Sequence, residues 1–127
     1  MREIKFRARN AEVPRCWIYG YFVKEWGCNY IINNDGKFKV IAGTECQYTG
    51  LKDSKGHEIY EGDIIGILLP AVKGTCWEIV WHDYCWQMLL HGRDDIHSYY
   101  VRAGEHLKNN EVTGNIYENP ELLKEGR

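Results

Sequence analysis

The chain has 127 residues, which is enough for one ordinary domain and too few for two of typical size. Apolar residues make up 44% of it and charged residues 27%, a globular balance that excludes intrinsic disorder. A formal net charge of −2 excludes attachment to nucleic acid by bulk charge alone, although folding can gather some of the sixteen Lys and Arg on one face. We therefore expect a single domain over residues 1–127.

The cysteines and the hydropathy pattern indicate the compartment. Five cysteines, irregularly spaced and without a C-x-x-C pair, indicate reduced thiols. No apolar run approaches the roughly 20 residues that a membrane helix needs. The first residues also lack the apolar core of a signal peptide. We expect a cytoplasmic protein without a membrane contact.

Strands are predicted throughout the first third of the chain. Charged and apolar residues alternate over residues 5–8, as in a half-buried strand. Over residues 16–24 both alternating faces are apolar, which is typical of a strand that lies between layers or oligomer partners. Residues 30–41 contain Asp35-Gly36 between two β-rich runs, which strongly indicates a hairpin.

The middle of the chain predicts a second hairpin and a central strand. Residues 48–51 and 57–60 flank the segment 53–56, whose Asp start and Gly end suit a type I turn closed by a left-handed residue. The run 64–69 is continuously apolar until Pro70. Such a run is typical of a strand buried on both faces.

The last third predicts a hairpin over residues 75–91, a helical turn within 101–107 and a final strand over 111–117. At 119–124, a capping Asn, a Pro at the first helical position and an early acid predict a short helix. The expected fold is therefore mostly β, with small barrel or meander sheets and a short C-terminal helix.

Four segments spread along the chain share a recognisable pattern. They are Met1-Arg2-Glu3-Ile4-Lys5-Phe6-Arg7-Ala8, Gln47-Tyr48-Thr49-Gly50-Leu51-Lys52-Asp53, Ile59-Tyr60-Glu61-Gly62-Asp63-Ile64 and Gly114-Asn115-Ile116-Tyr117-Glu118-Asn119-Pro120-Glu121-Leu122-Leu123. Together they resemble the YopX family of proteins encoded by bacteriophages and prophages. The first segment departs from the family at Arg9 and Asn10, where Trp and Asp are usual. The resemblance implies a mostly β fold, a phage or prophage origin and a bacterial host cytoplasm, but no reaction.

Several residues within these segments suit structural roles. Glycines at turns or close strand contacts permit positive φ or close approach of backbones, and an Asp after a Gly opens small SH3-like barrels. The structural set is Gly50, Gly56, Gly62, Asp63, Gly114 and Pro120.

Two groups of polar residues are candidates for chemical sites. His82, Cys85 and His91 could provide a nucleophile with its base or three metal ligands, but their surroundings and spacing match no known signature. An acidic group could hold Mg²⁺, although carboxylates are also ordinary turn residues. That group is Asp53, Glu58, Glu61 and Asp63. We expect no catalytic residue, no metal and no cofactor, and therefore no enzyme.

Aromatic residues with basic neighbours are the strongest functional feature. One set is Trp17, Tyr19, Tyr21, Lys24 and Trp26, and the other is Trp77, Trp81 and Trp86. Such residues stack unpaired bases in single-strand binders, but alternating aromatics also form cores and interfaces. We therefore expect a non-enzymatic binding module whose partner is another protein or a second copy. The alternative is single-stranded nucleic-acid binding through an aromatic and basic β face.

Overall fold

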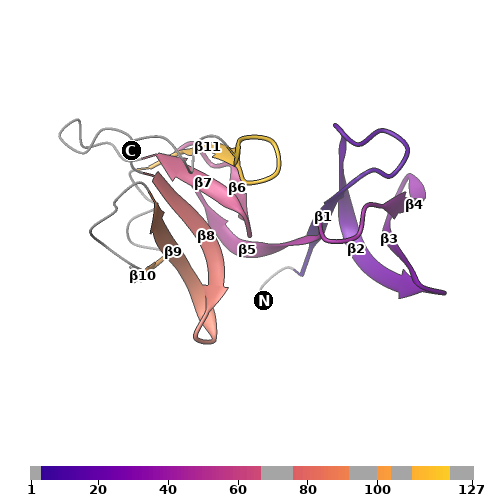
Figure 1. Ribbon diagram of the computed structural model, residues 1–127, viewed down its shortest axis with the longest axis horizontal. Coiled ribbons are helices and arrows are strands. Elements are labelled where there is room, and N and C mark those ends of the chain that lie inside the picture. Colours follow the sequence, from indigo (N-terminus) through magenta and orange to yellow (C-terminus); the bar gives the residue numbers. More distant parts are fainter. Residues whose placement is uncertain (1–3, 67–75, 92–99, 104–109, 121–127) are drawn as a thin grey trace. The chain divides into compact units, whose positions relative to one another are not determined.

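The computed structural model describes residues 4–66, 76–91, 100–103 and 110–120, and the regular elements in them are eleven β-strands (Figure 1). The prediction of a mostly β fold is confirmed. Contacts divide the chain into two compact units, Met1–Gly50 and Leu51–Arg127, here called the N-terminal unit and the C-terminal unit. Each unit is described by itself.

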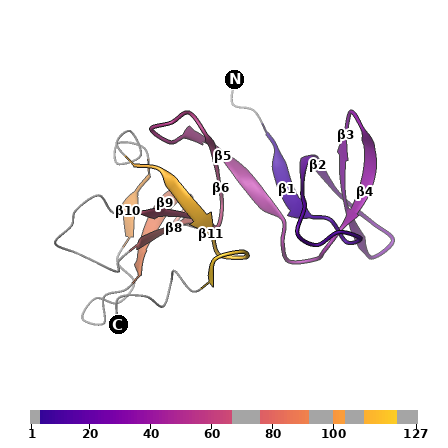
Figure 2. The same cartoon turned by 90° about the horizontal axis from the view of Figure 1, so that it is seen from above.

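The N-terminal unit is an antiparallel meander. Its strands are β1 (Phe6–Arg9), β2 (Trp17–Glu25), β3 (Cys28–Asn33) and β4 (Gly36–Val40), which lie in the order β4-β3-β2-β1 (Figure 2). The next strand, β5 (Cys46–Lys52), begins beside β1, where Cys46 pairs with Arg7, and continues into the C-terminal unit. The predicted hairpin about Asp35-Gly36 is confirmed, because Asn33 pairs with Gly36 across the turn.

The N-terminal sheet curls toward itself without closing. Asn10, just after β1, forms an isolated antiparallel bridge with Val40 at the end of β4. Two further backbone hydrogen bonds, from Ala11 N to Lys39 O and from Ile41 N to Arg9 O, support this bridge. Since one bridge is not a strand ladder, the described residues form meander sheets rather than a closed barrel.

The core of the N-terminal unit lies on one face of its sheet. Ala8, Ile31 and Val40 are buried there, and the partly buried side chains packed against them are Phe6, Ile18 and Phe22. Alternate residues of a strand point to opposite faces, so this core leaves the other set of β2 side chains on the outer face. One face of β2 packs into the core, whereas Tyr19 and Tyr21 on its other face are exposed, so the described residues do not enclose this strand between two layers.

The C-terminal unit holds the remaining strands. They are β6 (Glu58–Tyr60), β7 (Asp63–Gly66), β8 (Cys76–His82), β9 (Cys85–His91), β10 (Tyr100–Arg102) and β11 (Val112–Asn115). β6 neighbours β5, and the others form a sheet in the order β10-β9-β8-β7-β11. The described part of the predicted strand 64–69 belongs to β7, which lies inside this sheet between β8 and β11, and residues 67–69 lie outside the described residues. The prediction of a helical turn is wrong at Val101, whose backbone pairs with Met88. A β-branched residue beside an available strand edge favours that pairing.

Ile59, Ile65, Ile79, Trp86 and Met88 form the buried core of the C-terminal unit. This cluster is separate from that of the N-terminal unit, and a single domain over the whole chain stays a prediction. Of the predicted C-terminal helix, 119–124, residues 121–124 lie outside the described residues.

Candidate functional site

Asp53 belongs to the acidic group, and the hydrogen-bond partners of its carboxylate are backbone amides. Its side chain, 0% exposed, accepts hydrogen bonds from the backbone amides of Lys55, His57 and Val112, at 2.9, 2.9 and 3.0 Å. Burial, the largest single influence, raises the pKa of Asp53, but these amides and the nearby His57 together outweigh it and lower the pKa from its ordinary 3.8. Asp53 therefore closes the β5–β6 turn, whose predicted left-handed residue is Gly56, with φ at +83°.

Asp63 closes the next turn in the same way. It is 2% exposed, and its Oδ2 accepts the backbone hydrogen of Tyr60 at 2.8 Å. Gly62, with φ at +85°, donates its amide hydrogen to Ile79 O and accepts one from Ile116 N. Since both buried aspartates are bound by backbone, the acidic group is divided between two turns.

The last segment of the family pattern is also structural. An added Cβ at Gly114 would lie 2.4 Å from the Asn119 Oδ1, which accepts the amide hydrogen of Asn115. The Asn115 side chain in turn accepts amide hydrogens from Tyr117 and Glu118. Gly50, with φ at +85°, lies within β5, and Pro120 is the last described residue of this segment.

His82 and Cys85 pair across a hairpin, but their side chains do not meet as a nucleophile and base would. The Cys85 Sγ lies 3.7 Å from the backbone oxygen of His82, while the His82 ring stacks on Tyr100 with centroids 3.8 Å apart. His91 instead pairs with Glu78 at 2.9 Å. Among the described residues, no three His, Cys, Asp or Glu side chains are placed to hold a metal ion.

The aromatic residues of β2 occupy the face that turns away from the core. Trp17 is half-buried, whereas Tyr19 is 44% exposed and Tyr21 is 67% exposed. Tyr21 pairs with Ile32 of β3, which is itself 36% exposed. These outward side chains make a continuous aromatic and apolar strip on β2 and β3.

Basic residues from the neighbouring strands border this strip on both sides. The β3–β4 register places Lys37 opposite Ile32 and Lys39 opposite Tyr30, and the Lys37 Nζ lies 4.5 Å from the Tyr30 ring centroid. On the other side, the guanidinium carbons of Arg7 and Arg9 lie 4.5 and 5.8 Å from the Trp17 ring centroid. We call this sheet face, in which Arg7 is buried, the outer face: Arg7, Arg9, Trp17, Tyr19, Tyr21, Tyr30, Ile32, Lys37 and Lys39.

The sequence prediction found the aromatic half of this surface and missed most of its charges. Lys24 lies at a position that alternates with Tyr21 and Val23, so it belongs to the opposite side of β2. Lys37 and Lys39 lie on the face where the sequence prediction had placed Lys24. Their i, i+2 spacing in a predicted strand was the available signal, since it puts both side chains on one face.

The charges of the two units have opposite signs. The N-terminal unit contains eight Lys and Arg against five Asp and Glu, a net +3, and the C-terminal unit contains eight against thirteen, a net −5. The whole-chain value of −2 therefore conceals a basic unit. Within it, a hydrogen bond with Glu25 raises the pKa of Lys37 from its ordinary 10.5, so this lysine is charged at neutral pH.

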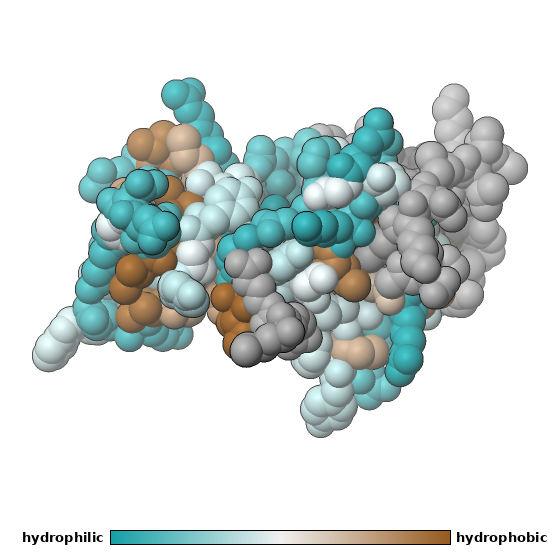
Figure 3. All heavy atoms as spheres, turned by 180° about the vertical axis from the view of Figure 1, so that it is seen from behind, coloured by the Kyte–Doolittle hydropathy of each residue, from teal (hydrophilic) through white to brown (hydrophobic). Residues whose placement is uncertain are grey.

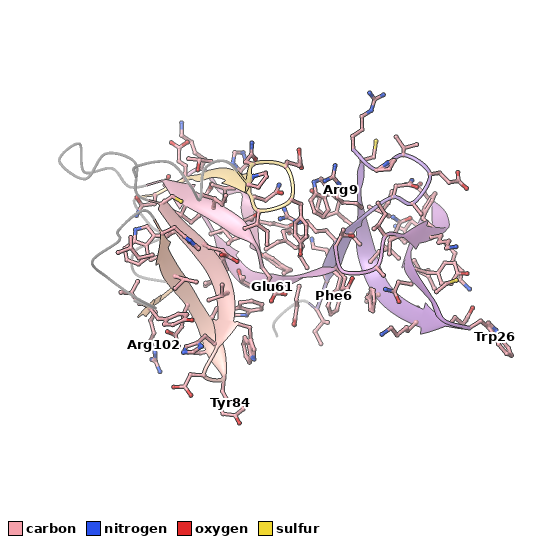
Figure 4. All side chains as sticks on the ribbon, viewed as in Figure 1. Phe6, Arg9, Trp26, Glu61, Tyr84 and Arg102 are labelled. Atoms are coloured by element: carbon pink, nitrogen blue, oxygen red, sulfur yellow. The ribbon has the colours of Figure 1, made fainter. Side chains whose placement is uncertain are left out.

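Two hairpin tips present aromatic residues in left-handed backbone conformations. Trp26 in the β2–β3 turn has φ at +51° and is 96% exposed, and Tyr84 in the β8–β9 turn has φ at +64° and is 89% exposed. Both project from their tips in Figure 4. Bulky residues are uncommon in this conformation, so the two turns keep exposed aromatics at a local energetic cost.

The remaining tryptophans have different surroundings. Trp77 and Trp86 pack within the C-terminal core, while Trp81 is 52% exposed and meets Trp86 edge to face with centroids 5.0 Å apart. Figure 3 shows one side of the protein, on which hydrophobic patches lie among hydrophilic side chains. Of the two predicted aromatic sets, the N-terminal one therefore has the broader exposed surface.

These features define an all-β protein of antiparallel sheets with a basic, aromatic sheet face. A family model described as YopX protein matches residues 6–124, and the chain belongs to the YopX family. The resemblance predicted from the four segments is thereby confirmed. The comparison with curated proteins gave no match. Within the described residues, no helix has the length and apolarity needed to cross a membrane.

Proposed function

We propose that this protein is a non-enzymatic binding module, encoded by a phage or prophage and active in the bacterial cytoplasm. Its partner binds the outer face of the N-terminal unit, with Trp26 at the margin. The predicted residues on this face, Trp17, Tyr19 and Tyr21, supply the aromatic contacts.

 Aromatic residues contribute much of the binding energy of interfaces, and Tyr19 and Tyr21 are exposed two residues apart on one strand face.

One observation carries the proposal: Tyr19, Tyr21 and Ile32 are exposed together on a sheet face that the unit's own core does not use. Single exposed apolar residues are ordinary, whereas a contiguous set rimmed by charges marks an interaction surface. The cations at its borders, Lys37, Lys39 and Arg9, make an anionic partner the best match.

A second candidate function, self-association, is favoured by the opposite charges of the two units. A net +3 unit and a net −5 unit attract each other between copies of one chain. In that arrangement the basic face of one copy meets the acidic unit of the next.

The test compares three immobilised full-length proteins as baits in lysate of the bacterial host. They are the unmodified chain, the double variant Tyr19→Thr with Tyr21→Thr, and the control Tyr84→Asn. Threonine keeps a high strand propensity, and asparagine suits the left-handed turn, so each variant removes exposed aromatic surface with little strain. Protein and nucleic acid retained on each bait are quantified separately.

We expect the unmodified chain and Tyr84→Asn to retain the same material and the double variant to lose it. Sedimentation velocity on the purified proteins measures self-association in parallel. Equal retention and equal sedimentation by all three proteins would refute the outer face as a binding surface.

A further inference from the structure

We propose that the outer face binds single-stranded nucleic acid, with bases stacked on its aromatic strip and phosphates held by its basic borders. This inference rests on the proposed function and names the partner of the same surface. It commits to unpaired DNA or RNA, whose shared chemistry is an exposed base and a phosphate backbone.

The aromatic strip has the layout that base stacking needs. Tyr19 and Tyr21 are two residues apart on β2, so their Cα atoms are separated by about 7 Å, which lets each ring take a different base. Trp17 continues the same row one step further along the strand. Every base has a π face, so such a row accepts strands of many sequences.

The cations lie where a backbone would run beside those bases. Lys37 is two strands away from Tyr21 through Ile32, a lateral distance of about 10 Å at the usual strand spacing. Lys39 follows on the same side of β4, and both lysines are exposed. Arg9 occupies the opposite border, next to Trp17.

The surface that each partner must present favours nucleic acid over a second copy of the chain. A second copy would need a surface that is both acidic and apolar and that matches the outer face in shape. A flexible single strand needs no such preformed surface. The attraction to phosphates is local, because Lys37, which is paired with Glu25, and Lys39 face the same side as the aromatics, and thirteen of the eighteen acids belong to the other unit. Duplexes are disfavoured, because paired bases cannot lie flat on a sheet.

The experiment is a fluorescence-anisotropy titration of the full-length protein with labelled oligomers of about 15 nucleotides, a length that covers the usual site sizes of small β domains. Single-stranded DNA, single-stranded RNA and duplex DNA form the three arms, each at low and near-physiological salt. Intrinsic tryptophan fluorescence is recorded at the same time, since Trp17 belongs to the face and Trp26 lies at its margin.

We expect single strands to bind more tightly than duplex, with tryptophan quenching and an affinity that falls as salt rises. If about three phosphates are neutralised, the logarithm of the affinity falls by about 2 for each tenfold rise in salt. Tyr21→Thr should weaken binding about tenfold or more, and Lys37→Gln with Lys39→Gln should weaken it and flatten the salt dependence. The matched controls, Tyr84→Asn and Lys52→Gln, should leave the affinity unchanged.

Three results would overturn the inference: no binding of either single strand at low salt, equal binding of duplex, or binding that the outer-face variants leave unchanged. The bait comparison separates this failure from that of the proposed function. If the double tyrosine variant loses a protein, or loses self-association, while oligonucleotides do not bind, the binding face stands and nucleic acid is the wrong partner. If no variant changes retention or sedimentation either, both proposals fall.

Discussion

The two units place their aromatic residues differently. In the C-terminal unit, Trp77 and Trp86 belong to the hydrophobic core, and the Trp81 ring packs edge to face against Trp86. In the N-terminal unit, the core is built from smaller aliphatic residues and phenylalanines, while Tyr19 and Tyr21 lie on the opposite face of the sheet. The C-terminal unit therefore uses aromatics in its own core, whereas the N-terminal unit exposes them on the face for which we propose a partner.

The family pattern follows the same division. Three of its four segments contribute buried turns to the C-terminal unit, where Asp53, Asp63 and Asn115 bind backbone amides. Side chains that satisfy buried backbone groups are costly to replace, because each loss leaves an amide without its partner. The pattern therefore describes mainly how the C-terminal unit folds, and the outer face lies largely outside it.

Asp53→Ala should produce the largest effect. It removes the acceptor of three backbone amides, and charged hydrogen bonds of this kind contribute about 1.5–3 kcal/mol each, so we expect a loss of about 3 kcal/mol or more in the free energy of unfolding. Denaturant unfolding measures it. The control is Asp35→Ala in the exposed β3–β4 turn, for which we expect a change within about 0.5 kcal/mol. Equal losses of unfolding free energy in the two variants would contradict the structural role given to Asp53.

The same carboxylate predicts a dependence on pH. Because the pKa of Asp53 is lower in the folded state than its ordinary 3.8, its contribution is complete above that value and is lost as the pH falls through the folded-state pKa. Asp53→Asn, which cannot ionise, should lack this part of the acid transition. Amide hydrogen exchange at Ile31 and Ile79 then shows whether both cores lose protection together, as a single domain requires.

Gly62→Ala should produce a smaller loss, about 1–2 kcal/mol, since alanine disfavours φ at +85°. Its added Cβ would meet Ile116 and Tyr117 at 3.4 Å, which is ordinary contact distance. Gly43→Ala in the N-terminal unit is the matched control, with φ at +87° and no atom within 4 Å of the new Cβ. Thermal and denaturant unfolding of the two variants separate backbone strain, which they share, from packing at Gly62. A neutral Gly62→Ala would contradict the role given to this turn.

Local sequence patterns predicted the strands and turns well. The Asp35-Gly36 hairpin and the apolar strand β7 follow from short-range rules that operate within a few residues. The failure at Val101 has a different origin, because its strand exists only through pairing with Met88 of β9. Such a contact between distant residues leaves little trace in the local pattern.

The candidate site was predictable only in part, for a similar reason. The alternation of aromatics on β2 identified Trp17, Tyr19 and Tyr21 from their own segment. Lys37 joins them only through the register of β3 between β2 and β4, which fixes which residues face each other. The basic character of the N-terminal unit was hidden as well, because it cancels in the charge of the whole chain.

The hairpin tips give the smallest and most discriminating effect on stability. Trp26→Asn and Tyr84→Gly each place a residue suited to positive φ in a two-residue turn, so each should raise the free energy of unfolding by up to about 1 kcal/mol. Trp26→Asn should also weaken oligonucleotide binding, because Trp26 lies in the turn that joins β2 and β3, the two strands of the aromatic strip, whereas Tyr84→Gly should not. Denaturant unfolding and the anisotropy titration measure the two effects on the same samples. If Trp26→Asn gains stability and loses binding while Tyr84→Gly keeps its binding, the N-terminal unit retains a strained turn for its partner. If Trp26→Asn instead loses stability, the Trp26 ring stabilises the fold.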